Sequence, residues 1–224
     1  MIITIDGPTA SGKSTVAKIL AQRLGFVHLN SGLLYRAVAY ILVYKFGYSE
    51  FDLQDPQQSD LDQIVCSGNL VYRDVNGEAQ VWYAGQDLTL FLKNFEMDNW
   101  ASISSANPKV RASLMTVQRA IGLDYNVVAE GRDTGTKVFP QADLKLFLTA
   151  SLPVRAVRWQ NYMRAKGQDY TIEQCQQAVD QRDQRDIQRV VAPLVKACDA
   201  IEVDNSNLDL NQTVDRIMNY LPTY

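Results

Sequence analysis

The chain has 224 residues, of which 46% are hydrophobic and 21% are charged, a composition typical of a folded globular domain. Its length allows one sizeable core with room for a small insertion, so we expect a single compact unit. Twenty-two basic residues against 25 acidic ones give a net charge of −3, which offers no global attraction to nucleic acid or to an anionic membrane.

The sequence predicts neither a membrane span nor a secretory signal. No stretch approaches the roughly eighteen apolar residues that a span needs, and Met1 leads directly into a strand pattern without a basic segment and a cleavage site. We therefore expect a cytoplasmic protein.

Its three cysteines, Cys66, Cys175 and Cys198, are an odd number without CxxC spacing, which indicates neither a disulfide framework nor a zinc site.

Short apolar runs alternate with helical patterns along the chain. The runs that we interpret as strands are residues 2–5, 26–29, 126–129, 144–148 and 200–203. After the first run, Val16, Ile19, Leu20 and Leu24 repeat at helical spacing, and Gly25 follows as a stop signal. This alternation predicts a parallel sheet wrapped by helices, which is the α/β class.

The pattern changes between residues 60 and 90. Two apolar runs, residues 70–72 and 81–83, flank Asn76 and Gly77, a dipeptide that favours a type I′ hairpin. A helix at about residues 33–46 precedes this region. Helical patterns at residues 97–121 follow it, with Pro108 marking the start of a second helix. We therefore expect a small antiparallel insertion between helices.

Residues 7–15 match the pattern G-x-x-x-x-G-K-[ST] at every fixed position, where a strand turns into a helix. Backbone N–H groups of such a loop point at phosphate oxygens, and the following helix adds the positive end of its dipole. We expect Lys13 to lie against the β- and γ-phosphates and the Ser14 hydroxyl to ligate Mg²⁺. The predicted ATP-binding residues of this loop are Gly7, Pro8, Thr9, Ala10, Ser11, Gly12, Lys13, Ser14 and Thr15.

The loop alone does not define an activity, because switch GTPases, motor ATPases and kinases share it. A GTPase needs a guanine-reading Asn-Lys-x-Asp, and this tetrapeptide does not occur. Residues 74–77 fit the looser Asp-x-x-Gly, but the predicted hairpin turn explains them better. A small-molecule kinase is the hypothesis that remains.

Four further segments resemble those of bacterial cytidylate kinases, in the same order along the chain. They are Asn-Ser-Gly-Leu-Leu-Tyr-Arg at 30–36, Asn-Pro-Lys-Val-Arg at 107–111, Glu-Gly-Arg-Asp-Thr-Gly-Thr at 130–136, and Arg-Asp-Gln-Arg-Asp-Ile-Gln-Arg at 182–189, which Ala-Pro-Leu follows at 192–194. The resemblance implies a P-loop three-layer fold with a five-stranded parallel sheet, a small antiparallel insertion that binds the nucleoside monophosphate, and a helical lid. It implies a core in residues 1–36 and 123–224, an insertion in 37–122 and a lid at about 153–172.

The reaction implied by this resemblance is transfer of the γ-phosphate of ATP to CMP or dCMP, a step of pyrimidine nucleotide metabolism. An acceptor phosphate is already ionised near neutral pH, so it needs positioning and charge cancellation, which guanidinium groups supply, rather than a general base. By resemblance, the CMP-binding residues are Ser31, Arg36, Ser102, Arg111, Arg132, Asp133, Arg182, Asp186 and Arg189, and the catalytic residues are Lys13, Arg132, Arg182 and Arg189.

The resemblance also implies finer roles. The positions implicated in reading the base are Ser102, Asp133 and Arg189, and the position implicated in binding the sugar is Asp186. Three arginines, Arg155, Arg158 and Arg164, fall where the lid begins, and lid arginines are expected to close over the triphosphate. The choice among the three stays open from the sequence, and Arg155 and Arg158 are the ones predicted to bind ATP.

Asn30 departs from the family, which usually has Asp at this point. An amide cannot present a carboxylate charge to a magnesium-bound water or to an arginine. Either Mg²⁺ is held through Ser14, water and phosphates alone, or Glu130 or Asp133 compensates. We interpret His28, the only histidine, as a packing residue.

Two other functions stay open from the sequence. One is a kinase for another small acceptor, such as shikimate or a different nucleoside monophosphate, and the other is a nucleotide-binding regulatory protein that has lost the chemistry.

For the cytidylate kinase hypothesis, the expected substrates are ATP and CMP or dCMP, with Mg²⁺ as the cofactor. We expect a monomer without nucleic-acid or membrane partners.

Overall fold

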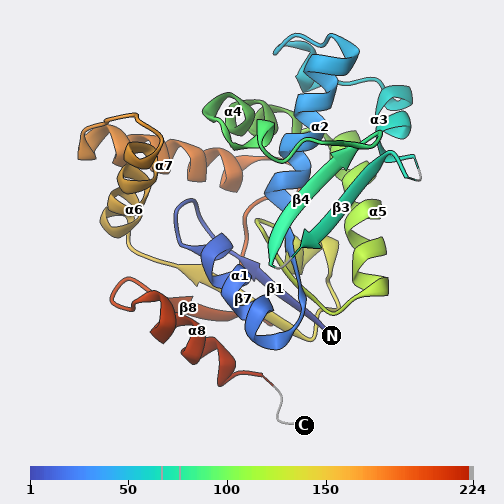
Figure 1. Ribbon diagram of the computed structural model, residues 1–224. Coiled ribbons are helices and arrows are strands. Elements are labelled where there is room, and N and C mark those ends of the chain that lie inside the picture. The colour runs from blue at the N-terminus through green and yellow to red at the C-terminus, as the bar shows by residue number, and fades with distance from the viewer. Residues whose placement is uncertain (67, 76, 222–224) are drawn as a thin grey trace.

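The computed structural model describes residues 1–66, 68–75 and 77–221, and a parallel sheet forms its centre (Figure 1). The five strands are β1 (Ile2–Asp6), β2 (Val27–Asn30), β6 (Val127–Gly131), β7 (Leu144–Thr149) and β8 (Ile201–Asp204). Their order across the sheet is β2-β6-β1-β7-β8, and every neighbouring pair is parallel. The predicted strands and the α/β class are confirmed.

The sheet is buried on both faces, because successive side chains along a strand point to opposite sides. Ile3, Ile5 and Val128 belong to one core cluster, which helices α1 (Lys13–Leu24) and α8 (Leu210–Met218) cover. Val127 and Ala129 belong to a second cluster on the opposite face, and residues of the insertion complete it. Burial on both faces is the reason that the strands read as continuous apolar runs.

Helix α1 begins within the phosphate loop and ends where the sequence predicts. Lys13 is its first residue, ahead of the first periodic apolar position, Val16. Gly25 follows the helix in the left-handed conformation with φ of 67°, and its N–H points back to carbonyl oxygens of the last turn. Glycine adopts this conformation without strain, so the predicted stop signal is confirmed.

The insertion between β2 and β6 contains helices and a small antiparallel sheet. Its helices are α2 (Ser31–Phe46), α3 (Gln58–Val65), α4 (Phe95–Ser104) and α5 (Pro108–Asp124), with 3-10 turns at Asp52–Gln54 and Phe91–Lys93. Its sheet consists of β3 (Leu70–Val75), β4 (Glu78–Tyr83) and β5 (Gln86–Asp87) in sequential order. The predicted hairpin is β3 and β4, which pair antiparallel. Asn76, in its predicted type I′ turn, lies outside the described residues.

The predicted helical region at residues 97–121 consists of two helices, α4 and α5. Pro108 is the first residue of α5, where its missing N–H has no intrahelical partner to lose. The Asn107 side chain caps this helix by accepting a hydrogen bond from the Lys109 N–H at 2.8 Å. The role predicted for Pro108 is therefore confirmed.

The hairpin of the insertion covers the outer edge of β2. The Tyr72 hydroxyl donates to the His28 carbonyl oxygen at 2.7 Å and accepts from the Asn30 N–H at 2.8 Å. Asp74 accepts from the His28 N–H at 2.8 Å. These side chains satisfy backbone groups that an edge strand would otherwise leave open, so the small sheet is attached to the large one.

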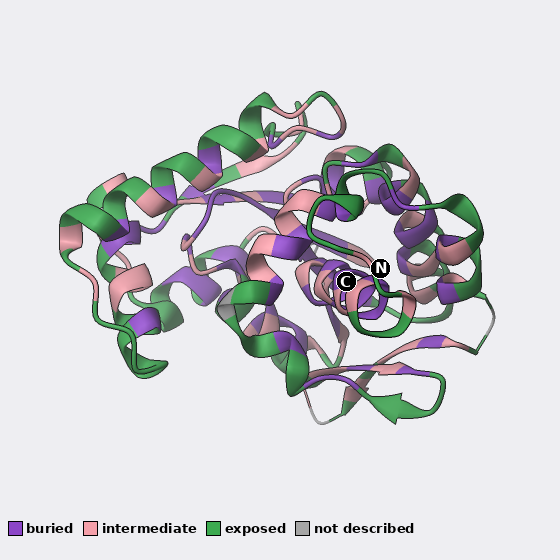
Figure 2. Ribbon diagram, turned by 90° about the horizontal axis from the view of Figure 1, so that it is seen from above, coloured by how far each residue is buried: buried purple, intermediate pink, exposed green. Residues whose placement is uncertain are grey.

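Helices α6 (Leu152–Ala165) and α7 (Ile172–Gln188) pack on each other as a hairpin that extends away from the sheet (Figure 1). Their outer faces are largely exposed (Figure 2). The loop between them reaches the insertion, where Lys166 Nζ donates to the Lys93 carbonyl oxygen at 2.6 Å. Among the described helices, none is both long enough and apolar enough to cross a bilayer.

Candidate active site

The phosphate loop joins β1 to α1, and its glycines are required by its shape. Gly7 has φ of 154°, and a Cβ at this position would lie 2.0 Å from the Leu148 carbonyl oxygen. Gly12 has φ of 93° and precedes the first turn of α1. No other residue type fits both demands without strain, so the chain turns sharply and opens the N-terminus of α1 to the site.

Lys13 and Ser14 present the two functional side chains of this loop. Lys13 is buried, and its Nζ donates to the Pro8 carbonyl oxygen at 2.6 Å and contacts Ser11 Oγ at 3.3 Å. Burial, together with the positive charge of Arg132, holds the pKa of Lys13 well below its ordinary value. Ser14 is exposed on the wall of the cavity. The negative charge of a bound triphosphate would raise the pKa of Lys13 again.

A buried ion pair supports the phosphate loop. Asp183 on α7 accepts a hydrogen bond from the Thr9 N–H at 2.7 Å and pairs with Arg155. Arg155 also donates to the carbonyl oxygens of Thr9, at 3.1 Å, and Ala150, at 2.9 Å. The guanidinium predicted to bind ATP is therefore engaged inside the protein, and Arg155 is not among the residues that line the cavity.

Arg158, the other lid arginine predicted to bind ATP, does line the cavity. Its Nη1 donates to Asn205 Oδ1 at 2.9 Å and to the Ser11 carbonyl oxygen at 3.2 Å. Asn205 follows β8 and also donates to the Ser11 carbonyl oxygen at 3.0 Å. Asn205 and Leu208 also line the cavity, although they lie in a part of the chain that none of the sequence motifs covers. The only available signal was the position of Asn205 after the last strand.

One cavity of about 1050 Å³ connects the phosphate loop to the insertion and to the helical hairpin. The predicted residues on its wall are Thr9, Ala10, Gly12, Lys13, Ser14, Thr15, Ser31, Arg36, Ser102, Arg111, Arg132, Asp133, Arg158, Arg182, Asp186 and Arg189. Besides Arg155, the predicted residues that do not line it are Gly7, Pro8 and Ser11, which lie in the body of the loop. The structure thus brings the predicted donor and acceptor residues together in one space.

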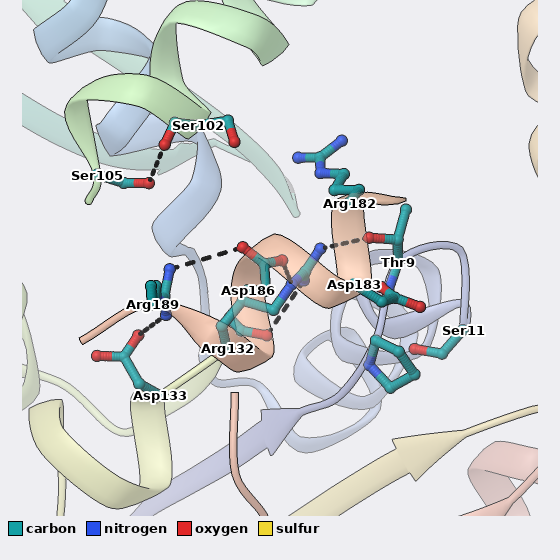
Figure 3. A network of polar contacts seen from close by, with 12 residues as sticks. Thr9, Ser11, Ser102, Ser105, Arg132, Asp133, Arg182, Asp183, Asp186 and Arg189 are labelled. Atoms are coloured by element: carbon teal, nitrogen blue, oxygen red, sulfur yellow. Dashed lines mark hydrogen bonds and ion pairs between the residues drawn. The ribbon is translucent and has the colours of Figure 1, made fainter. Parts of the chain in front are cut away.

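Arg132 lines the cavity and lies between Asp186 and Thr9 of the phosphate loop (Figure 3). Its Nε donates to Asp186 Oδ2 at 2.7 Å, and its Nη2 donates to Thr9 Oγ1 at 3.2 Å. Burial acts to raise the pKa of Asp186, but the guanidinium groups of Arg132 and Arg189 outweigh it and hold that pKa below its usual value. Asp186 therefore stays ionised and keeps Arg132 oriented toward the phosphate loop.

Asp133 joins two further arginines. It pairs with Arg111. Its Oδ1 also lies 3.6 Å from Arg189 Nη2 (Figure 3). Arg111 also lies over the ring of Tyr35, at 5.1 Å from its centroid, and donates to the Ser105 carbonyl oxygen at 3.0 Å. Burial raises the pKa of Tyr35 to about 12, so its hydroxyl stays protonated beside this arginine.

Ser102 lies on α4, across the cavity from the phosphate loop (Figure 3). Its neighbour Ser105 also lines the cavity and donates its hydroxyl to the Ser102 carbonyl oxygen at 3.3 Å. Ser104 is fully buried and does not reach the wall. The helical spacing therefore leaves two serines in a position to meet a ligand.

The segment that carries Arg132 and Asp133 is fixed to β1 by a residue that the sequence analysis missed. Asp6 accepts hydrogen bonds from the Thr134 N–H at 2.9 Å, the Thr134 hydroxyl at 2.8 Å and the Gly135 N–H at 2.8 Å. Thr134 opens a single π-helical turn, Thr134–Val138. The available signal was an acidic residue at the buried end of the first strand, directly before Gly7.

Asn30 and Glu130 face each other on paired strands. The Asn30 side chain caps α2 by accepting a hydrogen bond from the Leu33 N–H at 2.9 Å. Glu130 is buried, and within the described residues its Oε1 has no hydrogen-bond partner. His28 Nε2 lies 3.7 Å from this oxygen, so His28 contacts a site residue in addition to packing.

A magnesium ion fits the residues around Glu130. Burial acts to raise the pKa of Glu130, but His28, Lys13 and Ser14 outweigh it and hold that pKa below its usual value. An ionised carboxylate beside an exposed hydroxyl is the kind of oxygen set that Mg²⁺ accepts when phosphates complete its coordination. The described residues contain no cluster of three or more His, Cys, Asp or Glu side chains that could hold a metal without such help.

Known proteins resemble this chain in sequence over nearly its whole length. The cytidylate kinase family matches this chain over residues 3–223. A cytidylate kinase of Pseudomonas fluorescens is 40% identical over 217 residues, which cover 97% of this chain and 93% of the relative. One of a Geobacillus species is 38% identical over 216 residues, with 96% and 94% covered. A bifunctional pantoate ligase/cytidylate kinase of a Synechococcus strain is 37% identical over 97% of this chain, which spans only 40% of that relative's length.

Proposed function

The chain belongs to the cytidylate kinase family, and on this premise we propose that it transfers the γ-phosphate of ATP to CMP or dCMP, giving ADP and CDP or dCDP. The observation that carries the proposal is the single cavity, which the phosphate loop lines on one side and Arg36, Arg111 and Ser102 line on the other. Phosphoryl transfer requires the two substrates to meet in one site with their charges neutralised.

The donor half is the phosphate loop with α1. Its backbone N–H groups and the helix dipole attract the phosphates of ATP. Lys13 contributes its ammonium at the β- and γ-phosphates, and Arg158 approaches the triphosphate from α6. Arg155 acts indirectly in this proposal, because its ion pair with Asp183 supports the loop.

The acceptor half is formed by residues of α2, α4 and α5 and of the segment after β6. Arg36 and Arg111 hold the phosphate of CMP, and Ser31, which also lines the cavity, contributes to CMP binding. Ser102 and Asp133 are proposed to meet the cytosine. Polar groups arranged for cytosine reject uracil, because a mispaired buried donor or acceptor is costly.

The remaining charged residues of the site belong mainly to α7. Asp186 is proposed to bind the sugar while it orients Arg132. Arg189, which lies between Asp133 and Asp186, is proposed to contact both the base and the phosphates.

The transfer step needs no general base. An oxygen of the ionised CMP phosphate attacks the γ-phosphorus, and the bond from this phosphorus to the oxygen bridging it to the β-phosphorus breaks. The charge that moves onto ADP is neutralised by Lys13, Arg132 and Arg182, which the fold holds in place before substrates arrive.

Magnesium is the proposed cofactor. Ser14 and Glu130 would hold it together with the phosphates, and Glu130 supplies the negative charge that Asn30 cannot. When bound, the ion neutralises phosphate oxygens and lowers the barrier to transfer.

Residues of this chain line the cavity from the phosphate loop to the acceptor side. We propose a monomer with nucleotides as its partners and with neither nucleic acid nor membrane bound. Three free cysteines, of which Cys66 and Cys198 are exposed, suit a reducing compartment, so we place the protein in the cytoplasm.

A panel of acceptors tests the specificity. ATP and Mg²⁺ are supplied with CMP, dCMP, UMP, AMP or shikimate, and the rate of ADP formation is measured for each. We expect CMP and dCMP to give the highest kcat/KM. If shikimate or another monophosphate is the best acceptor, the proposed substrate is wrong.

A further inference from the structure

Asp98 is a carboxylate on the cavity wall that the mechanism above does not use. It lies on α4, one turn before Ser102. Its Oδ1 accepts a hydrogen bond from Arg36 Nη1 at 2.9 Å and lies 4.0 Å from Arg182 Nη2. This oxygen atom therefore links α4 to α2 through Arg36, and it links the insertion to the helical hairpin through Arg182.

Arg36 has one side engaged and another without a partner. Its Nη1 donates to Asp98, whereas its Nε is buried and has no hydrogen-bond partner among the described residues. The Nε–Nη2 edge of a guanidinium carries two parallel donors that match two oxygens of a phosphate. Because buried donors in proteins are normally satisfied, a ligand anion is the expected partner of this edge.

Asp98 also separates two positive charges. Arg36 and Arg182 approach the same oxygen, and without a carboxylate between them they would repel each other. Burial, and next to it the charge of Arg132, lowers the pKa of Arg182, while Asp98 acts in the opposite direction. The carboxylate thus stabilises the pair of cations in the position that they hold here.

We propose that Asp98 is a positioning residue for the acceptor phosphate, because it fixes the Nη1 side of Arg36 beside Arg182 and turns the Nε edge toward the ligand. The inference rests on the proposed function and extends it to a residue outside the motifs. A carboxylate near a phosphate also repels it, so the two effects of Asp98 have opposite signs. Two substitutions separate them.

Asp98→Ala removes both the acceptor oxygen and the charge, and Asp98→Asn keeps an oxygen that Arg36 can use. We expect Asp98→Ala to raise the KM and the Kd for CMP roughly tenfold, as the loss of an orienting partner does, with a smaller change in kcat. Asp98→Asn should restore most of the affinity. The Kd for ATP, and the Kd for cytidine, which lacks the phosphate, should stay unchanged in both variants.

Equal or tighter CMP binding by Asp98→Ala would overturn the proposal, since it would mean that repulsion dominates or that the contact is unimportant. A matched loss of cytidine affinity would also contradict it, because a general distortion of α4 would then explain the effect. Glu96→Gln, an exposed carboxylate on the same helix, is the control.

The effect of Asp98→Ala should be much smaller in an Arg36→Ala background, because the proposed effect acts mainly through the contact between these two residues. Turnover of CMP by the unmodified chain is measured first. Its absence would count against the proposed function, whereas unaltered CMP affinity in an active Asp98→Ala variant would count against the role of Asp98 alone.

Discussion

The Asp183 carboxylate on α7 accepts a hydrogen bond from the Thr9 N–H of the phosphate loop at 2.7 Å (Figure 3). Thr9 in turn accepts from Arg132 through its hydroxyl at 3.2 Å. The helix that carries Arg182 and Asp186 is therefore connected directly to the loop that receives ATP. A change at this contact should affect stability and donor binding together.

Asp183→Ala should destabilise the protein by about 3 kcal/mol, because it leaves the buried Arg155 guanidinium unpaired and the Thr9 N–H without its acceptor. The free energy of unfolding in urea measures this, and the Kd for ATP should rise in the same variant. Asp180→Ala, on an exposed position of the same helix, is the control. Unchanged stability of Asp183→Ala would mean that the ion pair does not support the loop.

Lys13→Ala should lower kcat roughly a hundredfold or more, because a preorganised charge at the transferring phosphate is lost. Steady-state kinetics with saturating ATP and CMP measure the effect. Lys18, which lies on the same helix and pairs with Glu78 outside the site, offers the matched control Lys18→Ala. An unchanged kcat would remove Lys13 from the mechanism.

Binding of ATP should take up protons at alkaline pH. Burial, with the charge of Arg132, lowers the pKa of Lys13 in the free protein, and a bound triphosphate raises it again by attraction. Between these two pKa values the free protein lacks a proton that the complex holds, so ATP affinity falls as the pH rises through this window.

Calorimetry in buffers of different ionisation enthalpy, from about pH 7 to about pH 10, measures the proton uptake. The uptake should disappear in Lys13→Arg, since a guanidinium does not titrate there. Equal uptake by both proteins would assign the proton to another group.

Glu130→Gln should raise the Mg²⁺ concentration needed for half-maximal rate roughly tenfold, in line with the loss of an oriented carboxylate near a metal. Asn30→Asp should change it little, because Asp caps α2 as well as Asn does and Glu130 already supplies the charge. Titration with Mn²⁺, followed by water-proton relaxation, gives a readout independent of turnover. A large gain in metal affinity for Asn30→Asp would contradict this division of roles.

The sequence predicts the strands of the parallel sheet well because these strands are buried along their length. β1 and β6 read as strands because both faces of the sheet are covered, and Gly25 and Pro108 act as local signals that no tertiary contact overrides. Helix α1 begins at Lys13, three residues before Val16, the first residue of the periodic apolar pattern. The first turn of the helix is part of the phosphate loop, where its N–H groups face the ligand site, so it needs no apolar residue.

The site could be predicted only where a motif marks it. Asp98 lies in no recognisable pattern, and its importance appears only when α4 approaches α2 and α7. Asp6 acts through contacts with residues far away in sequence. Arg155 shows the opposite case: its position near the lid suggested a phosphate ligand, but the buried Asp183 beside it determines where its guanidinium points.

The cavity is proposed to transfer the γ-phosphate of ATP to CMP. Incubation with Mg²⁺, CMP and ATP labelled at the γ-phosphorus, followed by separation of the nucleotides, tests it directly. We predict that the label appears in the β-phosphate of CDP in one-to-one proportion with ADP. Label found only in inorganic phosphate, or retained in ATP, would contradict the account.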